Sequence, residues 1–245
     1  MTDSGSDLRE DQARIDAAVR LARAERELFE LTTSALLPGA ALDVATAAIG
    51  RVVAELQAAA LPGRRPVDRP DLGAVVQDFF AYSPVSGRCH PMAPPIELWA
   101  APGGRESAGV EGRATFNLAY EGPPTCLHGG IIALVFDELL GSANLVAGHP
   151  GMTGTLAVTY RRPTPLGQEL SLRAWVEGVD GRKVTTKGQI THLGEVTAEA
   201  TGLFIAVDPL KMLAVAKANA DAVRGEQLLD ASLADAAGRL PTRPS

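Results

Sequence analysis

An apolar helix that starts with glycines and carries two acids in its middle constrains this chain more than any other segment. The run 122–143 opens with a Gly-Pro-Pro turn, continues through His128-Gly-Gly, and then stays apolar apart from Asp137-Glu138. Glycines at a helix start let a ligand approach the backbone, and the unpaired N–H groups there favour negative charge. An acid in so apolar a helix is costly unless it is paired, neutralised or used. We therefore expect a catalytic or binding helix rather than a packing helix.

The composition indicates a soluble globular protein of the cytoplasm. Hydrophobic residues make up 46% of the chain, and its net charge of -6 gives no basic field that would attract nucleic acid or anionic lipid. No run approaches the roughly 18 apolar residues of a membrane span, and the acidic, polar N-terminus is not a secretory signal. Cys89 and Cys126 have no metal-like spacing. We expect both thiols to be free, in a reducing compartment, and no metal site.

The ends of the chain are predicted to be helical. Apolar residues recur at helical spacing over 7–32, and Asp43 is placed to cap a second, Ala-rich helix that runs to about residue 60. Another Ala-rich helix is predicted over 210–235. Residues 61–70 are a linker by composition, and the repeated prolines of 83–95 exclude regular structure there.

The middle of the chain alternates polar and apolar residues, as half-buried strands do. Turn signals at Asp180-Gly181 and Leu193-Gly194 separate the last three strands. The order predicts an α+β domain in which an antiparallel sheet wraps one long helix and the last four strands form a meander. The other face of the sheet would need cover from the N-terminal helices or a second subunit. The predicted strands are 96–101, 110–120, 153–162, 169–179, 182–192 and 196–207, and the helix is 128–147.

Five linked motifs in this order resemble a known family. They are Gly122-Pro-Pro with His128-Gly-Gly, Asp137 nine residues after that histidine, Met152-Thr153, Tyr160-Arg-Arg-Pro with Pro165-Leu-Gly, and Gly181-Arg-Lys. Over about residues 90–208 the chain is similar to the PaaI-like acyl-CoA thioesterases, which have the hotdog fold. The resemblance divides the chain into an N-terminal helical extension (1–60), a linker and Pro-rich loop (61–95), a hotdog domain (96–208), and a C-terminal helix and tail (209–245).

The resemblance also implies roles for single residues. Asp137 resembles the catalytic carboxylate, a general base or nucleophile, and Glu138 is the fallback. The N–H of Gly129 resembles the group that holds the thioester oxygen, and the hydroxyl of Thr153 resembles one that helps to place the attacking water. The catalytic candidates are Asp137, Gly129, His128 and Thr153, and the substrate-binding candidates are Gly130, Glu138, Arg161 and Arg162. The implied substrate is an acyl-CoA, the implied assembly is a homodimer or tetramer, and no cofactor, nucleic acid or membrane is implied.

One departure from the family leaves other functions open. Some members carry an Asn or Gln about six residues before the Gly-Gly pair. This chain has neither residue in the corresponding segment, 122–126, where Thr125 is the possible substitute for that side chain. A non-catalytic acyl-CoA binding or regulatory protein on the same fold is therefore the main alternative. A hydratase would carry an Asp followed, after four residues, by His, and this chain has no such pair. Cys126 beside His128 lacks an orienting third group, so a small apolar cysteine is expected rather than a thiol nucleophile.

The spacing within the apolar helix itself predicts a shared site. Gly129 and Asp137 are eight residues apart, which corresponds to about 12 Å along a helix axis. One thioester needs both the donor and the acid within about 3 Å or one water, so a single helix cannot supply both. Two antiparallel copies could, which places the site across a two-fold dimer.

Overall fold

The structure, a computed structural model, describes residues 4–60, 81–102 and 109–207 of the 245-residue chain. The predicted linker at 61–70 and the predicted helix over 210–235 lie outside these residues. Among the described residues the helices are α1 (Ser4–Ser34), α2 (Gly39–Ala59), the short 3₁₀ helix η2 (Leu118–Tyr120) and α4 (Gly129–Val146). The strands are β1 (Ile96–Ala100), β2 (Gly109–Thr115), β3 (Gly151–Tyr160), β4 (Glu169–Asp180), β5 (Lys183–His192) and β6 (Glu195–Ala206).

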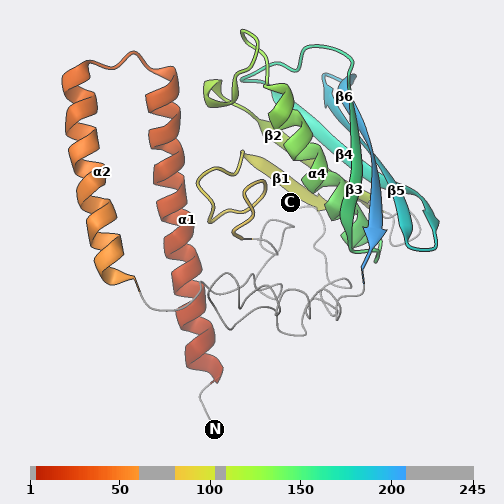
Figure 1. The fold of residues 1–245 in the computed structure, drawn as a ribbon, viewed down its shortest axis with the longest axis horizontal. Coiled ribbons are helices and arrows are strands. Elements are labelled where there is room, and N and C mark those ends of the chain that lie inside the picture. Colours follow the sequence, from red (N-terminus) through yellow and green to blue (C-terminus); the bar gives the residue numbers. More distant parts are fainter. Residues whose placement is uncertain (1–3, 61–80, 103–108, 208–245) are drawn as a thin grey trace.

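The strands form one antiparallel sheet in the order β1-β2-β4-β5-β6-β3. Figure 1 shows the sheet curving around α4, which crosses its inner face. This arrangement confirms the α+β class and the hotdog fold that the sequence predicted. The glycine-rich turns also form where they were predicted, with positive φ at Gly181, Leu193 and Gly194.

The core lies between α4 and the inner face of the sheet. In β4, Leu170, Leu172 and Ala174 are buried while the residues between them are exposed, as the alternation predicted. A fully buried leucine side chain stabilises the fold by about 1.5–3 kcal/mol. The packing of α4 against these buried side chains therefore fixes the position of the helix on the sheet. The largest fully buried side chains are Leu98, Val110, Phe116, Val135, Phe136, Leu139, Leu140, Leu170, Leu172, Ile190 and Phe204.

The structure corrects three expectations about the elements. The last four strands are not a meander, because β3 pairs with β6 at the sheet edge, and β4 pairs with β2 and β5 instead. The strand predicted over 110–120 ends at Thr115, since η2 follows it. Asp43 caps no helix, because α2 already begins at Gly39, after Pro38.

The outer face of the sheet is not covered by α1 or α2, and its cover by a second subunit stays a prediction. Its side chains are largely polar, and several form surface ion pairs, such as Arg113 with Glu97 and Lys187 with Glu177. The helix α1 lies instead along the side of the domain that carries α4, against η2 and the segment 81–95 (Figure 1).

The two N-terminal helices differ in how they meet the domain. In α1, Ala22 is buried, and the Phe29 ring lies edge-on to Tyr120 with 6.5 Å between ring centroids. None of the α2 residues, all of which the structure describes, is buried. Its exposed large apolar residues are Leu42, Val44, Ile49, Val52, Val53 and Leu56.

The helix α4 contradicts the expectation that no apolar run in the chain approaches the length of a membrane span. Its 18 residues have a mean hydropathy of 1.5, which by length and composition alone is enough to cross a membrane. Half of that helix is buried against the sheet. The apolar residues of α4 are therefore those of a core helix, which packs one side against the sheet.

Candidate active site

The start of α4 is built by its own side chains and by the turn before it. His128 is the N-cap residue, and its Nδ1 accepts a 2.9 Å hydrogen bond from the Gly130 N–H. The N–H of Ile131 and that of Ile132 both donate to the His128 carbonyl. His128 therefore caps the helix, and the Gly130 N–H is already used.

The Gly129 N–H is left over from this arrangement. Among the described residues it donates no recorded hydrogen bond. As the first residue of α4, Gly129 needs no partner within the helix for its N–H. A free N–H at a helix N-terminus, with the helix dipole behind it, favours negative charge on a ligand oxygen. This is the group that the resemblance assigned to the thioester oxygen.

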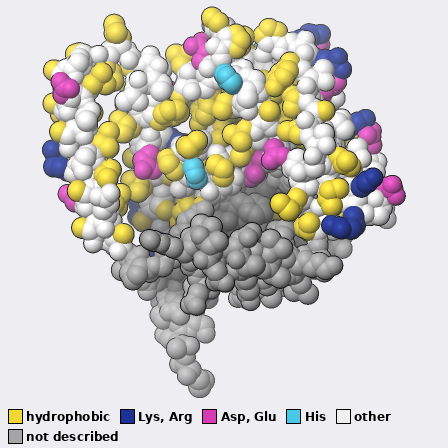
Figure 2. Space-filling model, in the orientation of Figure 1, with side chains coloured by type: hydrophobic (Ala, Val, Ile, Leu, Met, Phe, Trp, Pro, Cys, Tyr) yellow, Lys and Arg dark blue, Asp and Glu magenta, His cyan; other side chains and the backbone are white. Residues whose placement is uncertain are grey.

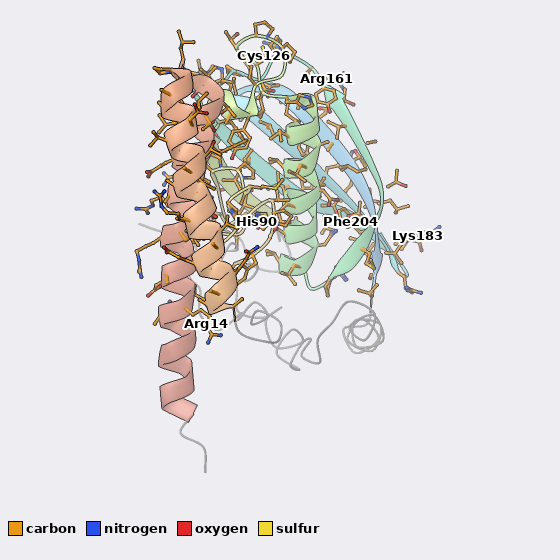
Figure 3. All side chains as sticks on the ribbon, turned by 60° about the vertical axis from the view of Figure 1, so that its left-hand side comes forward. Arg14, His90, Cys126, Arg161, Lys183 and Phe204 are labelled. Atoms are coloured by element: carbon orange, nitrogen blue, oxygen red, sulfur yellow. The ribbon has the colours of Figure 1, made fainter. Side chains whose placement is uncertain are left out.

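The turn before α4 depends on a close backbone approach. A Cβ at Gly122 would lie 2.7 Å from the His128 Cα, so only glycine fits there. Thr125 has a φ of 63°, and its N–H donates to the Glu121 carboxylate at 2.7 Å. Cys126 is half-buried, and its N–H donates to the Pro123 carbonyl, as part of this turn. Figure 3 shows Cys126 at the end of the fold where α4 begins.

Asp137 lies two turns further along α4 and contacts the sheet. Its Oδ1 accepts a 2.7 Å hydrogen bond from the hydroxyl of Thr153 on β3. The register of β3 shifts between Thr153 and Thr155, so Thr153 sits at an irregularity of the strand. The structure thus joins two residues that the sequence analysis had placed in one site, and it leaves the Asp137 side chain exposed.

A second hydrogen bond between α4 and β3 had no role in the sequence analysis. The Tyr160 hydroxyl donates to the Gly129 carbonyl at 2.9 Å. With the contact between Thr153 and Asp137, it fixes α4 to β3 at both ends of the candidate site. Tyr160 was part of a recognised motif, but nothing in that motif indicated a contact with a residue 31 positions earlier.

Glu138 faces away from this site, toward the segment 81–95. Its Oε1 accepts hydrogen bonds from the hydroxyls of Ser83 and Ser86, and Ser86 is 4% exposed. The two neighbouring acids therefore have different partners: Asp137 contacts β3, whereas Glu138 holds the Pro-rich loop.

The two arginines that follow β3 are engaged in ion pairs. Arg161 pairs with Glu199, and Arg162 pairs with Glu195 at 2.9 Å. Both backbone N–H groups donate to the Thr197 carbonyl, so the chain has left β3 at this point. All four side chains are partly or largely exposed, and such pairs contribute only about 0–1 kcal/mol. A phosphate group could replace either partner acid at small cost.

The surface around Asp137 is more apolar than an exposed acid requires. Leu134, one turn before it, is 37% exposed, and Met152 on β3 is 63% exposed. Figure 2 shows a small acidic group among apolar side chains over α4. The outer edge of β3 has no strand partner among the described residues. Unpaired strand edges and exposed apolar patches mark surfaces that other chains cover.

Among the side chains that the structure describes (residues 12–60, 81–102 and 109–207), no three from His, Cys, Asp or Glu lie close enough together to hold a metal ion.

The chain is similar to several known proteins. A family model described as thioesterase superfamily matches residues 126–201. The chain is 40% identical over 91 residues to acyl-coenzyme A thioesterase THEM4 of Xenopus laevis, which covers 36% of this chain and 41% of that protein. It is 36% identical over 98 residues to THEM4 of Mus musculus, covering 39% of this chain and 42% of that protein. The chain thus spans about two fifths of the length of the curated relatives it matches.

A solved structure matches far more of the chain. The crystal structure of a thioesterase superfamily protein is 33% identical and has a TM-score of 0.67. The match covers 77% of this chain and 94% of the other. It therefore extends well beyond the segment that the family model matches.

Proposed function

Because this chain belongs to the thioesterase superfamily, we propose that it hydrolyses acyl-CoA thioesters to a free acid and coenzyme A. One observation carries the proposal: α4 presents an unused N–H at Gly129 and, two turns on, Asp137 held by the Thr153 hydroxyl. The names of the curated relatives support the choice of an acyl-coenzyme A substrate.

In the proposed reaction Asp137 removes a proton from a water molecule as it attacks the thioester carbon. The carbonyl oxygen gains negative charge and accepts a hydrogen bond from the Gly129 N–H, a donor fixed in advance by the helix. The tetrahedral intermediate then breaks its carbon–sulfur bond. The coenzyme A thiolate leaves and takes up the proton, and the acyl group leaves as a carboxylic acid. No metal or bound cofactor takes part.

The two groups meet across two copies of the chain in this proposal. Asp137 and Gly129 of one copy are separated by about 12 Å along α4, too far for one carbonyl group. The exposed edge of β3 and the apolar residues Leu134 and Met152 beside Asp137 supply a surface for a second copy. A two-fold dimer sets Asp137 of each copy opposite Gly129 of the other.

The arginines after β3 are proposed as binders of the coenzyme A phosphates. Arg161 and Arg162 are exposed, and each could exchange its carboxylate partner for phosphate. We also propose that the protein is cytoplasmic, where the thiols of Cys89 and Cys126, which form no disulfide with each other, would stay reduced.

Release of coenzyme A from a panel of short, long and aromatic acyl-CoAs tests the proposal. Asp137→Ala and Asp137→Asn should lower turnover by about a hundredfold to ten-thousandfold, the usual contribution of a general base. Glu138→Gln is the matched control, because an amide oxygen can still accept from Ser83 and Ser86. It should keep most of the activity.

Two outcomes would contradict the proposal. If Glu138→Gln abolishes turnover and Asp137→Asn retains it, Glu138 rather than Asp137 is the catalytic carboxylate. If the wild type binds acyl-CoA saturably but does not hydrolyse it, the protein is a binding protein. The presence of Thr125, where some family members have Asn or Gln, favours this alternative.

A further inference from the structure

A cavity of about 520 Å³ lies between α1 and the body of the domain. One wall comes from α1, and the others come from the segment 81–95 and from β1. Figure 3 shows His90 of that segment between α1 and α4. Cavities of about 300–1,000 Å³ commonly hold small molecules. Of the described residues that form the candidate active site, Gly129, Asp137, Thr153 and Tyr160 are absent from its lining.

The described lining of the cavity is basic, although the chain as a whole has a net charge of -6. Its lining includes Arg23 and Arg26 of α1 and Arg88 of the loop. The described lining contains one acid, Glu97, whose carboxylate is paired with Arg113 at 2.8 Å. Arg23 and Arg26 are three residues apart and so lie on the same face of the helix.

The two helix arginines have different tasks. Arg26 Nη1 donates to the His90 carbonyl at 2.8 Å, and its Nη2 donates to the Arg88 carbonyl at 3.4 Å. Arg26 therefore holds the loop against α1 and forms the wall of the cavity. Among the described residues Arg23 has no recorded hydrogen bond or ion pair, so its guanidinium is available to a ligand.

The described lining also has an apolar part. Trp99 is 8% exposed and Ile96 is 5% exposed, and both line the cavity, together with Ala93. The cavity therefore has guanidinium groups on one side and the side chains of a tryptophan and an isoleucine on the other. Such a lining suits a ligand with an anionic group and an apolar body. A carboxylate or phosphate is held by arginine through paired N–H donors, and an apolar body packs on the rest.

We propose that this cavity binds an amphipathic organic anion, with its oxyanion head at Arg23 and its apolar body against Trp99. The site is separate from the proposed catalytic groups. The cavity is linked to α4, because Ser86 lines the cavity and also donates a hydrogen bond to Glu138 of that helix.

Trp99 offers a direct readout of binding. The chain has two tryptophans, and the other, Trp175, lies on β4 beside Arg173. In a Trp175→Phe background, fluorescence would report on the cavity alone. The ligands are decanoate and decyl phosphate below their micelle concentrations, with decanol and inorganic phosphate as probes that each lack one half of the ligand. The two anions distinguish a carboxylate site from a phosphate site.

We expect a saturable fluorescence change with one or both anions, and much weaker binding of decanol and inorganic phosphate. Arg23→Gln should weaken binding of the anion by about tenfold or more, as the loss of a charge-assisted hydrogen bond does. Arg20→Gln is the matched control, because Arg20 is on the same helix, is exposed and does not line the cavity. Circular dichroism of both variants checks that α1 remains folded.

Three results would overturn the proposal: no saturable change with either anion, equal affinity of the Arg23→Gln and Arg20→Gln variants, or decanol binding as tightly as decanoate. None of them bears on turnover. A failure here therefore remains distinguishable from a failure of the proposed thioesterase activity, which coenzyme A release measures.

Discussion

The hydroxyl of Thr153 donates a 2.7 Å hydrogen bond to Oδ1 of Asp137, and so joins the edge strand β3 to the central helix α4. A carboxylate on an exposed helix face would otherwise sample several rotamers. One oxygen is now fixed by the strand, and the other is free to face a water molecule. This gives a means of orienting Asp137 within a single copy of the chain.

The first prediction concerns this bond. Thr153→Val keeps the shape of the side chain but removes the donor, and it should lower kcat/KM by about tenfold to a hundredfold, the range for a hydrogen bond to a charged group. Thr153→Ser keeps the hydroxyl and should keep most of the activity. Coenzyme A release by both variants measures the difference, and an equal loss in both would mean that the hydroxyl does not act on Asp137.

The second prediction concerns the shared site. Gly129→Pro removes the proposed oxyanion donor without breaking α4, because proline is well tolerated at the first helical position. His128, with φ of -62° and ψ of 132°, already has a backbone compatible with a following proline. Homodimers of Gly129→Pro and of Asp137→Asn should both be nearly inactive.

Mixed dimers of these two variants decide where the site lies. If Asp137 of one copy serves Gly129 of the other, one of the two sites in a mixed dimer contains both native residues. Each mixed dimer should then have about half the activity of a wild-type dimer. Mixtures that stay as inactive as the parents, although heterodimers are seen by native mass spectrometry, would show that each site lies within one chain.

The third prediction concerns the cap of α4. His128→Ala removes the acceptor of the Gly130 N–H and should lower the free energy of unfolding by about 1 kcal/mol, the typical value of an N-cap. His128→Asn supplies another good cap and should restore most of that loss. Urea unfolding followed by circular dichroism measures both, and equal destabilisation by Asn and Ala would count against capping as the role of His128.

The fourth prediction concerns high pH. Burial raises the pKa of the Tyr120 phenol above its ordinary 10.0, while the nearby Arg26 lowers this pKa and Glu30 raises it. Above about pH 10 the unfolded chain loses this proton while the folded chain keeps it, so the phenol's contribution to stability is complete below that pH and is lost as the pH rises through the folded-state pKa.

Tyr120→Phe should remove this contribution. Between about pH 9 and about pH 11 the wild type should lose more of its free energy of unfolding than Tyr120→Phe does, since the phenylalanine has no proton to lose. Denaturant unfolding at both pH values gives the comparison. Parallel losses in the two proteins would show that Tyr120 ionises equally easily in both states.

Much of the local structure followed from the sequence. The apolar helix was predicted over 128–147 and is found at Gly129–Val146, and the last three strands lie within a residue or two of their predicted ranges. These elements are set by interactions between residues close in sequence. Alternation places one side of a strand in the core. In the two predicted turns, Gly181, Leu193 and Gly194 adopt positive φ values, which glycine allows most readily.

Of the two adjacent acids in α4, Asp137 and Glu138, only Asp137 had a partner that could be predicted. Thr153 and Asp137 had been assigned to one site by resemblance, and the structure brings them together. The separate engagement of Glu138 by Ser83 and Ser86 was not foreseen, because those serines lie more than 50 residues earlier, in a segment without periodicity. Adjacent acids on a helix point in different directions, and sequence alone does not say what each one meets.

The sequence by itself determined the helix of the candidate site, the alternating strands and the residues with chemistry to offer. Only the tertiary structure decided the neighbours: β3 at the sheet edge beside β6, Tyr160 on the Gly129 carbonyl, and the arginine-lined cavity under α1. The physical reason is that strand pairing and helix docking depend on contacts between distant segments. An alternating strand presents the same apolar face whichever neighbour it has, so its pattern records that it is half-buried but not which strand lies beside it.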